Sequence, residues 1–232
     1  MEAPGFYGKM PSKGDFVQRR LARGVVDPFD AWLQQAIAHS KAGLGDGWTD
    51  IYLTSPIWRF AWTDGVCGEA AGGVLMPSID RVGRHYPLFI LGGLPAGTAP
   101  FHAAADPGGW YRDLEAAALG CLDADADMDA FDARLIDVGA LGAMSDGAAE
   151  PQVLPGVAEA RRGWRMGDGA SDHLASGLFP ALLDASMRID FCHYSLWWTV
   201  GSDLVAPTFL IYPGLPPVAD FQAFMTGEWG GP

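Results

Sequence analysis

Charged side chains occur inside apolar or glycine-rich stretches of the sequence, where a charge is costly to bury unless it is paired. The side chains concerned are Lys9, Lys13, Asp15, Arg59, Asp80, Arg81 and Arg84. A structural network would pair Arg59 or Arg84 with Asp15 or Asp80. A recognition surface would instead leave the charges accessible, because interfaces are enriched in Arg and aromatic residues. An enzyme of unknown substrate could use Asp15, Asp80 and an arginine, since active sites gather perturbed charges.

The familiar catalytic and cofactor-binding motifs are missing from the sequence. It contains no GxSxG nucleophile elbow, no GxxxxGKS or GxxxxGKT phosphate loop and no strand-linked GxGxxG. The five histidines include no HExxH or close pair, and the three cysteines form no CxxC. We therefore predict no cofactor and no metal, and we expect reduced, buried thiols at Cys67, Cys121 and Cys192.

Alternating carboxylates form an acidic ladder ahead of one predicted helix. They are Asp123, Asp125, Asp127, Asp129 and Asp132. This spacing resembles the start of a calcium loop, but the required glycine is replaced by Met128 and the final glutamate by Arg134. We interpret the ladder as a solvated acidic linker in which Asp127 or Asp129 caps the following helix.

The charge balance restricts the possible partners. The 232 residues, 49% of them apolar, favour a single domain over residues 1–232, because chains usually divide only beyond about 250 residues. The 15 basic and 28 acidic residues give a net charge of −13. Such an excess repels nucleic acid and anionic lipid unless a local basic patch exists, and it favours basic partner proteins. The basic stretch Arg19, Arg20 and Arg23 is expected on an exposed helix face.

Membrane insertion and secretion are not expected. No run reaches the roughly 18 apolar residues that a membrane span needs. The N-terminus lacks the charged and apolar regions of a secretory signal. We therefore expect a cytoplasmic protein, and the sequence does not indicate its oligomeric state.

Hydrophobic periodicity and turn residues predict an interleaved series of helices and strands. A short strand and a structured loop are expected over residues 5–16. A helix is expected over 28–42, with Asp27 as its cap and Pro28 at its first position. The other predicted single elements are a strand at 86–93, two helices within 107–138 broken near 123–127, a loop at 139–160, a helix at 172–187 kinked or split by Pro180, and a short helix at 218–225.

Two β-hairpins complete the predicted sheet. Residues 57–63 and 66–76 flank the turn dipeptide Asp64-Gly65, and residues 191–200 and 204–212 flank a three-residue turn. Hairpins interleaved with helices indicate an α/β fold, with helices on the faces of a mixed, largely antiparallel sheet.

Two adjacent tryptophans, Trp197 and Trp198, lie in the second hairpin. Neighbouring strand residues point to opposite faces, so one indole is expected in each layer. If helices cover both faces, both indoles are core residues. If one face is open, its tryptophan becomes an anchor for a partner.

Five short segments carry a more specific pattern. They are GFYGKMPSKGDF (5–16), WLQQAI (32–37), SPIWRF (55–60), MPSIDRVGRHYPL (76–88) and SLWWT (195–199). In this order they resemble the TagF family of type VI secretion-associated proteins. Residues 1–90 match closely and the tryptophan strand more weakly, while residues 100–190 carry nothing diagnostic. The most specific signal is GKxPxxGDF followed by PSxDRVGR.

The resemblance implies a three-layer α/β/α sandwich and a cytoplasmic, post-translational repressor of type VI secretion. It implies a non-enzymatic protein that binds the forkhead-associated scaffold protein of the secretion system, here as a stand-alone regulator without a phosphatase domain. We expect the loops at 5–16 and 76–88 to form part of the binding surface. The candidate protein-binding residues are Lys9, Lys13, Asp15, Arg59, Ser78, Asp80, Arg81, Arg84 and Trp198.

Overall fold

A seven-stranded antiparallel sheet forms the middle of the structure. This computed structural model describes residues 2–95, 98–106, 108–142, 152–153, 164–165 and 179–229. The strands of the sheet are β1 (Gly5–Gly8), β2 (Val17–Arg19), β3 (Trp58–Trp62), β4 (Ala71–Met76), β5 (Leu88–Gly93), β8 (Tyr194–Thr199) and β9 (Thr208–Pro213). Their spatial order is β2-β1-β5-β4-β3-β8-β9, and every neighbouring pair is antiparallel. A separate ribbon pairs β6 (Gln152–Val153) with β7 (Trp164–Arg165).

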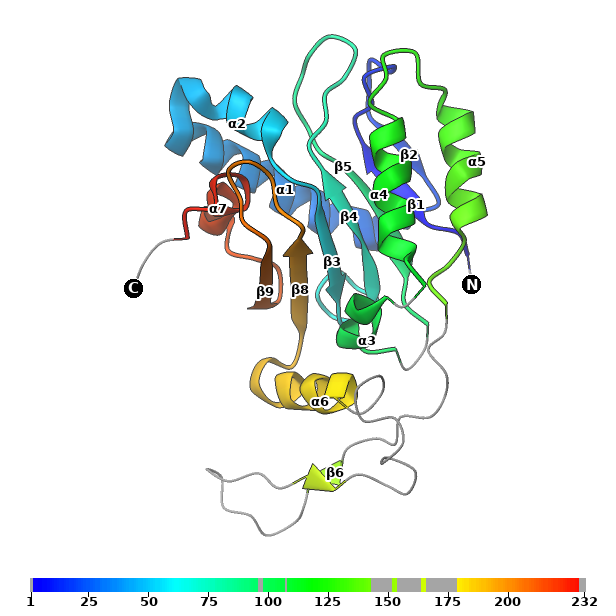
Figure 1. Cartoon of the computed structure of the whole chain (residues 1–232), viewed down its shortest axis with the longest axis vertical. Helices are drawn as coiled ribbons and strands as arrows, with labels where there is room; N and C mark the ends of the chain where they lie inside the picture. Colours follow the sequence, from blue (N-terminus) through cyan, green and yellow to red (C-terminus); the bar gives the residue numbers. More distant parts are fainter. Residues whose placement is uncertain are drawn as a thin grey trace.

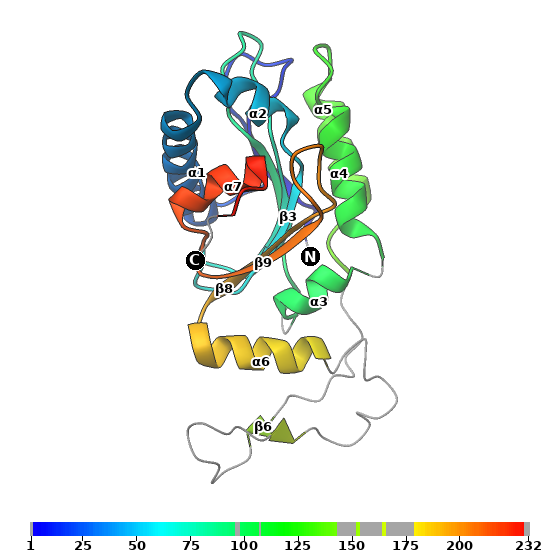
Figure 2. The same cartoon turned by 60° about the vertical axis from the view of Figure 1, so that its left-hand side comes forward.

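Helices cover both faces of this sheet (Figure 1). On one face lie α1 (Arg23–Leu44), α2 (Trp48–Thr54) and α7 (Phe221–Thr226), with the short 3-10 helices η1 (Gly45–Gly47) and η3 (Val218–Asp220) leading into α2 and α7. On the other face lie α3 (Pro100–Ala105), α4 (Trp110–Gly120) and α5 (Met128–Val138), so that the sheet is seen between two helical layers (Figure 2). One apolar cluster fills each interface between sheet and helices. The predicted α/β/α fold is confirmed, and its sheet is antiparallel throughout the described strands rather than mixed.

Strand alternation places Trp197 and Trp198 in different layers. Trp197 is fully buried, and its ring centroid lies 5.6 Å from that of Trp32 in α1. Trp198 is half-buried on the opposite face, where it makes an edge-on contact with Tyr111 of α4 at 4.8 Å between centroids. One indole therefore enters each layer, as predicted, and both pack against the core.

Both predicted hairpins pair as expected, but their connections are longer than the tight turns we predicted. Residues 63–70 connect β3 to β4, and residues 200–207 connect β8 to β9. Each connection buries an apolar side chain in the core, Cys67 in the first and Val205 in the second, and both are 1% exposed. Burial of these side chains favours the longer connection over a two- or three-residue turn.

The first helix begins earlier than predicted. It starts at Arg23, so Asp27 is not its cap and Pro28 lies within its second turn. Val25 and Val26 precede the predicted start and are buried in the core. Their burial stabilises the additional turn, and this tertiary contribution outweighs the local proline signal.

The acidic ladder has two structural tasks. Asp127 caps α5, since its carboxylate accepts hydrogen bonds from the backbone N–H groups at positions 129 and 130. Asp132, which is 7% exposed, pairs with Arg19 at 3.1 Å and with Arg20 at 2.5 Å. The predicted cap is therefore confirmed, but this end of the ladder is not a solvated linker.

The prediction that Arg19, Arg20 and Arg23 lie on one exposed helix face is wrong. Arg19 ends β2, Arg20 has a φ of +54°, and Arg23 begins α1, so the three arginines do not share one helical turn. β2 is an edge strand, and the two pairs with Asp132 tie it to α5 in the neighbouring layer.

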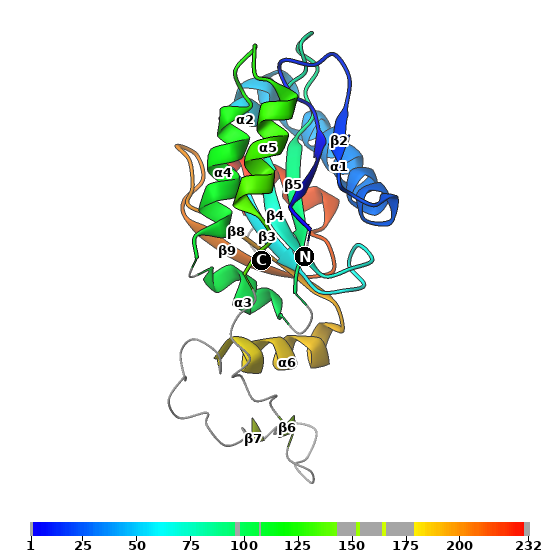
Figure 3. The ribbon, with the colours of Figure 1, turned by 90° about the vertical axis from the view of Figure 1, so that its right-hand side faces the viewer.

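The remaining elements agree with the sequence except in detail. α4, α5 and the C-terminal η3–α7 unit form where predicted. The three-residue β2 and the short helices α2 and α3 were not predicted, because elements of three to seven residues are too short to show periodicity. α6 (Phe179–Phe191) lies past one end of the sheet (Figure 3), with Pro180 as its second residue rather than at a kink. Residues 172–178 of the predicted helix, and most of the loop predicted at 139–160, lie outside the described residues.

The three cysteines divide into two environments. Cys67 and Cys121 are buried, and burial raises the pKa of both thiols to about 12. Cys192 is exposed, which contradicts the prediction of three buried thiols. It follows the last residue of α6 and has a φ of +59°, so it belongs to the turn that leads into β8.

Candidate functional site

The two loops with the most specific sequence pattern lie against each other at one end of the sheet. We call residues 9–16 and 78–86 the paired loops. The first loop leaves β1 at Gly8, whose φ is +140° and where a Cβ atom would stand 2.2 Å from the carbonyl oxygen of Pro87. A glycine is therefore required for the close approach. Beyond it, the backbone N–H of Arg81 donates to the carbonyl of Lys13 at 2.8 Å and joins the two loops.

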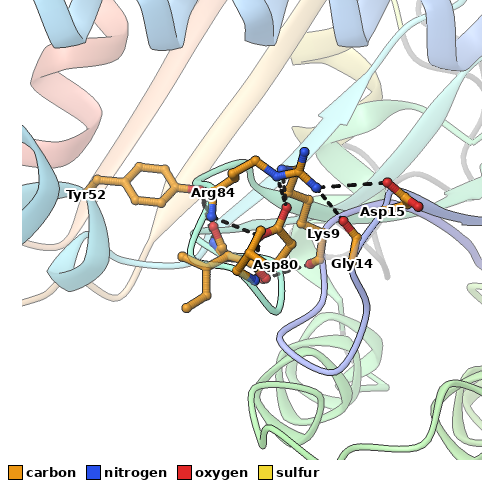
Figure 4. A network of polar contacts seen from close by, with 9 residues as sticks. Lys9, Gly14, Asp15, Tyr52, Asp80 and Arg84 are labelled. Atoms are coloured by element: carbon orange, nitrogen blue, oxygen red, sulfur yellow. Dashed lines mark hydrogen bonds and ion pairs between the residues drawn. The ribbon is translucent and has the colours of Figure 1, made fainter.

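A buried carboxylate, Asp80, organises the paired loops (Figure 4). It is 1% exposed, and its Oδ2 atom lies 2.6 Å from both Lys9 Nζ and Arg84 Nε. Its Oδ1 atom accepts the backbone N–H groups of Val82 at 3.0 Å and Arg84 at 2.9 Å. Burial alone would raise the pKa of the Asp80 carboxyl, but these four donors hold it well below its usual range. Asp80 therefore stays ionised and fixes the conformation of the 80–84 turn.

Tyr52 of α2 supports the second loop from the opposite side. Its buried hydroxyl donates to the carbonyl of Ser78 and accepts the backbone N–H of Ser78, both at 3.0 Å. The Ser78 hydroxyl in turn donates to the carbonyl of Lys9 at 2.7 Å. Burial raises the pKa of the Tyr52 hydroxyl above its usual value, so it remains a neutral donor. Lys9, Ser78 and Asp80 are thus positioning residues inside the paired loops.

Other side chains of the paired loops reach the surface. The guanidinium of Arg84 forms an ion pair with Asp80 and also donates to the carbonyl of Gly14. It lies 3.9 Å from the exposed carboxylate of Asp15. Within the described residues, Lys13 and the exposed Arg81 have no carboxylate partner. The accessible candidates for partner contact are therefore Lys13, Asp15, Arg81 and Arg84.

Arg59 and Trp198 belong to a different part of the molecule. Arg59 lies in β3 directly opposite Trp198 in β8, on the face that carries α4. Its guanidinium forms two parallel hydrogen bonds to Glu115 of α4, at 2.7 and 2.6 Å, and the pair raises the pKa of Arg59. Asp15 and Asp80 are therefore the wrong partners for Arg59, whereas the predicted pair of Arg84 and Asp80 is present.

Two supporting residues escaped the sequence analysis. Glu115 follows Arg59 by 56 positions and Tyr52 precedes Ser78 by 26, so neither distance corresponds to a local pattern. The only available signal for Glu115 was its place on the helix face that begins with the apolar residues Trp110 and Leu114. A charge on such a face requires a partner in the neighbouring layer.

Two hollows among the described residues contain neither Asp15 nor Asp80. One hollow of about 260 Å³ lies near Arg20 and Glu69, and a smaller one of about 20 Å³ lies near Trp58 and Phe224. Neither is lined by Asp15 or Asp80. Across the described ranges, no three His, Cys, Asp or Glu side chains are arranged to hold a metal ion, and no helix there is long and apolar enough to cross a bilayer.

The paired loops and the Arg59–Glu115 pair fall within one matched region. A family model described as TagF N-terminal domain, Type VI secretion system-associated, matches residues 5–138. The chain belongs to the TagF family. It is also similar to a solved structure, PA0076 from Pseudomonas aeruginosa PAO1, with 36% identity and a TM-score of 0.81. That similarity covers 99% of this chain and 96% of PA0076, and so includes the second hairpin. No curated protein matches the chain.

Proposed function

We propose that this TagF-family protein is a non-enzymatic repressor that acts after translation in the cytoplasm. In this proposal it binds the forkhead-associated scaffold protein of the type VI system and keeps it inactive. The main support for this proposal is the structure of the paired loops. A buried ion-pair hub of Lys9, Asp80 and Arg84 fixes their backbone, while Lys13 and Arg81 stay unpaired at the surface. A rigid loop frame with accessible charges suits recognition, because little conformational entropy is lost on binding.

The state of the carboxylates supports a binding role over a catalytic one. Both oxygens of Asp80 are occupied by donors and its pKa is depressed, so it is poorly suited to accept a proton as a general base. Asp15 is fully exposed at the protein surface, where solvent weakens its electrostatic interactions. Asp80 is enclosed but fully engaged by its donors, and Asp15 is open to solvent, so neither carboxylate has the environment that tunes a catalytic acid or base.

The direct test is calorimetric titration of the purified chain into the purified forkhead-associated scaffold protein at several salt concentrations. We expect stoichiometric binding. The physiological test measures type VI secretion in a strain that lacks the tagF gene and is complemented with the native chain, which should restore repression. If the correctly folded chain neither binds the scaffold nor represses secretion, the proposed function is refuted.

A further inference from the structure

The paired loops carry a local charge opposite to that of the whole chain. They contain Lys9, Lys13, Arg81 and Arg84 against only Asp15 and Asp80, whereas the chain has a net charge of −13. Several basic residues elsewhere are neutralised by close carboxylates. These pairs are Arg19 and Arg20 with Asp132, Arg59 with Glu115, and Arg188 with Asp184. The cations left accessible at the paired loops form a basic patch on an acidic protein.

The electrostatic potential next to the paired loops is also positive, as the pKa of a neighbouring histidine indicates. Lys41 of α1 lies over the ring of Trp48, 4.4 Å from its centroid, and Trp48 meets His85 edge-on at 5.3 Å. The pKa of His85 is lowered by burial and then by the positive charges of Lys41 and Lys9, against a smaller opposite effect of Asp80. All three lysines of the chain are therefore close to this end of the sheet.

The backbone that carries the cations of the patch is held in place before any partner arrives. The backbone of Arg81 is joined to Lys13 and lies in the turn fixed by Asp80. Its guanidinium passes over Gly14, where an added Cβ atom would be 3.4 Å from Nη2. The fold thus sets the backbone positions from which the two side chains extend, which reduces the ordering cost of binding.

Apolar side chains flank the cations. Phe16 is 46% exposed, yet its ring stacks on Tyr7 at 5.3 Å and meets Tyr86 edge-on at 4.8 Å. Val82 is 69% exposed at the tip of the second loop. A supported aromatic ring in the same pair of loops as exposed arginines is the composition of an interface anchor rather than of an ordinary solvated loop.

We propose that the paired loops bind an acidic peptide segment of the partner protein. In this arrangement Lys13 and Arg81 pair with Asp or Glu side chains of the segment, and Phe16 and Val82 contact an apolar residue next to them. The inference rests on the proposed function, since it names the chemistry of the partner surface. A short peptide segment fits better than nucleic acid or a lipid surface, because the rest of the acidic chain repels an extended polyanion.

The test compares two double variants that change the net charge equally. Lys13→Glu with Arg81→Glu reverses the patch, and Arg23→Glu with Arg134→Glu reverses two exposed arginines of α1 and α5 that have no carboxylate partner within the described residues. Both variants should have the same unfolding midpoint as the native chain. At physiological salt, the first should weaken binding to the purified forkhead-associated scaffold about tenfold or more, and the second by less than about twofold. High salt should reduce the difference.

The outcomes separate this inference from the proposed function. No binding by the native chain would overturn both. Native binding that the patch variant retains, or that both variants lose equally, would overturn the acidic-segment inference and leave the regulator intact. Tight binding of the native chain to duplex DNA or to phosphatidylserine vesicles, lost on reversing Lys13 and Arg81, would show that the patch recognises a different polyanion and would also overturn the inference. Weaker scaffold binding by the patch variant alone would support it.

Discussion

Replacing Lys9 with methionine tests whether the buried ion pair holds the paired loops together. Lys9 is 5% exposed, and its Nζ atom lies 2.6 Å from Asp80 Oδ2. Methionine keeps an apolar stem of similar length but removes one charged donor, while three donors to the carboxylate remain. A hydrogen bond to a charged group contributes about 1.5–3 kcal/mol, so the Lys9 variant should lose about 2 kcal/mol of unfolding free energy. For a chain of this length, that loss lowers Tm by about 4–8 °C.

Lys13→Met is the matched control, because it makes the same chemical change in the same loop at a lysine that has no carboxylate partner in the described structure. Its stability should stay within about 0.5 kcal/mol of the native chain. Thermal unfolding followed by circular dichroism gives Tm, and urea unfolding followed by tryptophan fluorescence gives the free energy. If the Lys9 and Lys13 variants unfold at the same temperature, the buried pair does not hold the loops and the reasoning is refuted.

Three further predictions concern the same framework and its surroundings. The difference in unfolding free energy between the native chain and Lys9→Met should be constant from neutral pH to about pH 4, because the unfolded-state pKa of Asp80 is the same in both chains. It should shrink at lower pH, where Asp80 of the folded variant protonates before that of the native chain. Urea titrations at each pH would show a constant difference if the idea is wrong. Tyr52→Phe should cost about 1–3 kcal/mol by leaving the buried Ser78 N–H unsatisfied, more than Tyr212→Phe, which removes a hydroxyl from a half-buried site. Ellman's reagent should label only Cys192 rapidly in the native chain and all three thiols after unfolding, and rapid native labelling of a second thiol would contradict the assigned burial.

Local patterns were sufficient for much of the architecture. Helical periodicity located α4 and α5, and the position just ahead of an apolar repeat narrowed the helix cap to Asp127 or Asp129, of which the structure shows Asp127. The strand position of Trp197 and Trp198 determined that their indoles enter opposite layers. These predictions succeeded because each depends on residues within one or two helical turns or along one strand.

Predictions failed where a distant contact outweighed the local signal. Pro28 and Asp27 form a standard helix start, but burial of Val25 and Val26 extended the helix backwards. The turn signal at Gly65 was real, yet the connection lengthened to bury Cys67. Burial depends on the layer that covers a segment, and that layer is formed by residues far away in the chain.

The sequence by itself determined the layered α/β fold, the acidic net charge and which residues of the paired loops carry charge. The tertiary structure alone decided which charges pair. Lys9 meets Asp80 across 71 positions and Arg59 meets Glu115 across 56, whereas Lys13 and Arg81 remain accessible. The reason is physical: a charge is neutralised by whichever opposite charge the fold brings within a few ångströms, and sequence spacing determines that neighbour only inside a single helix, strand or turn.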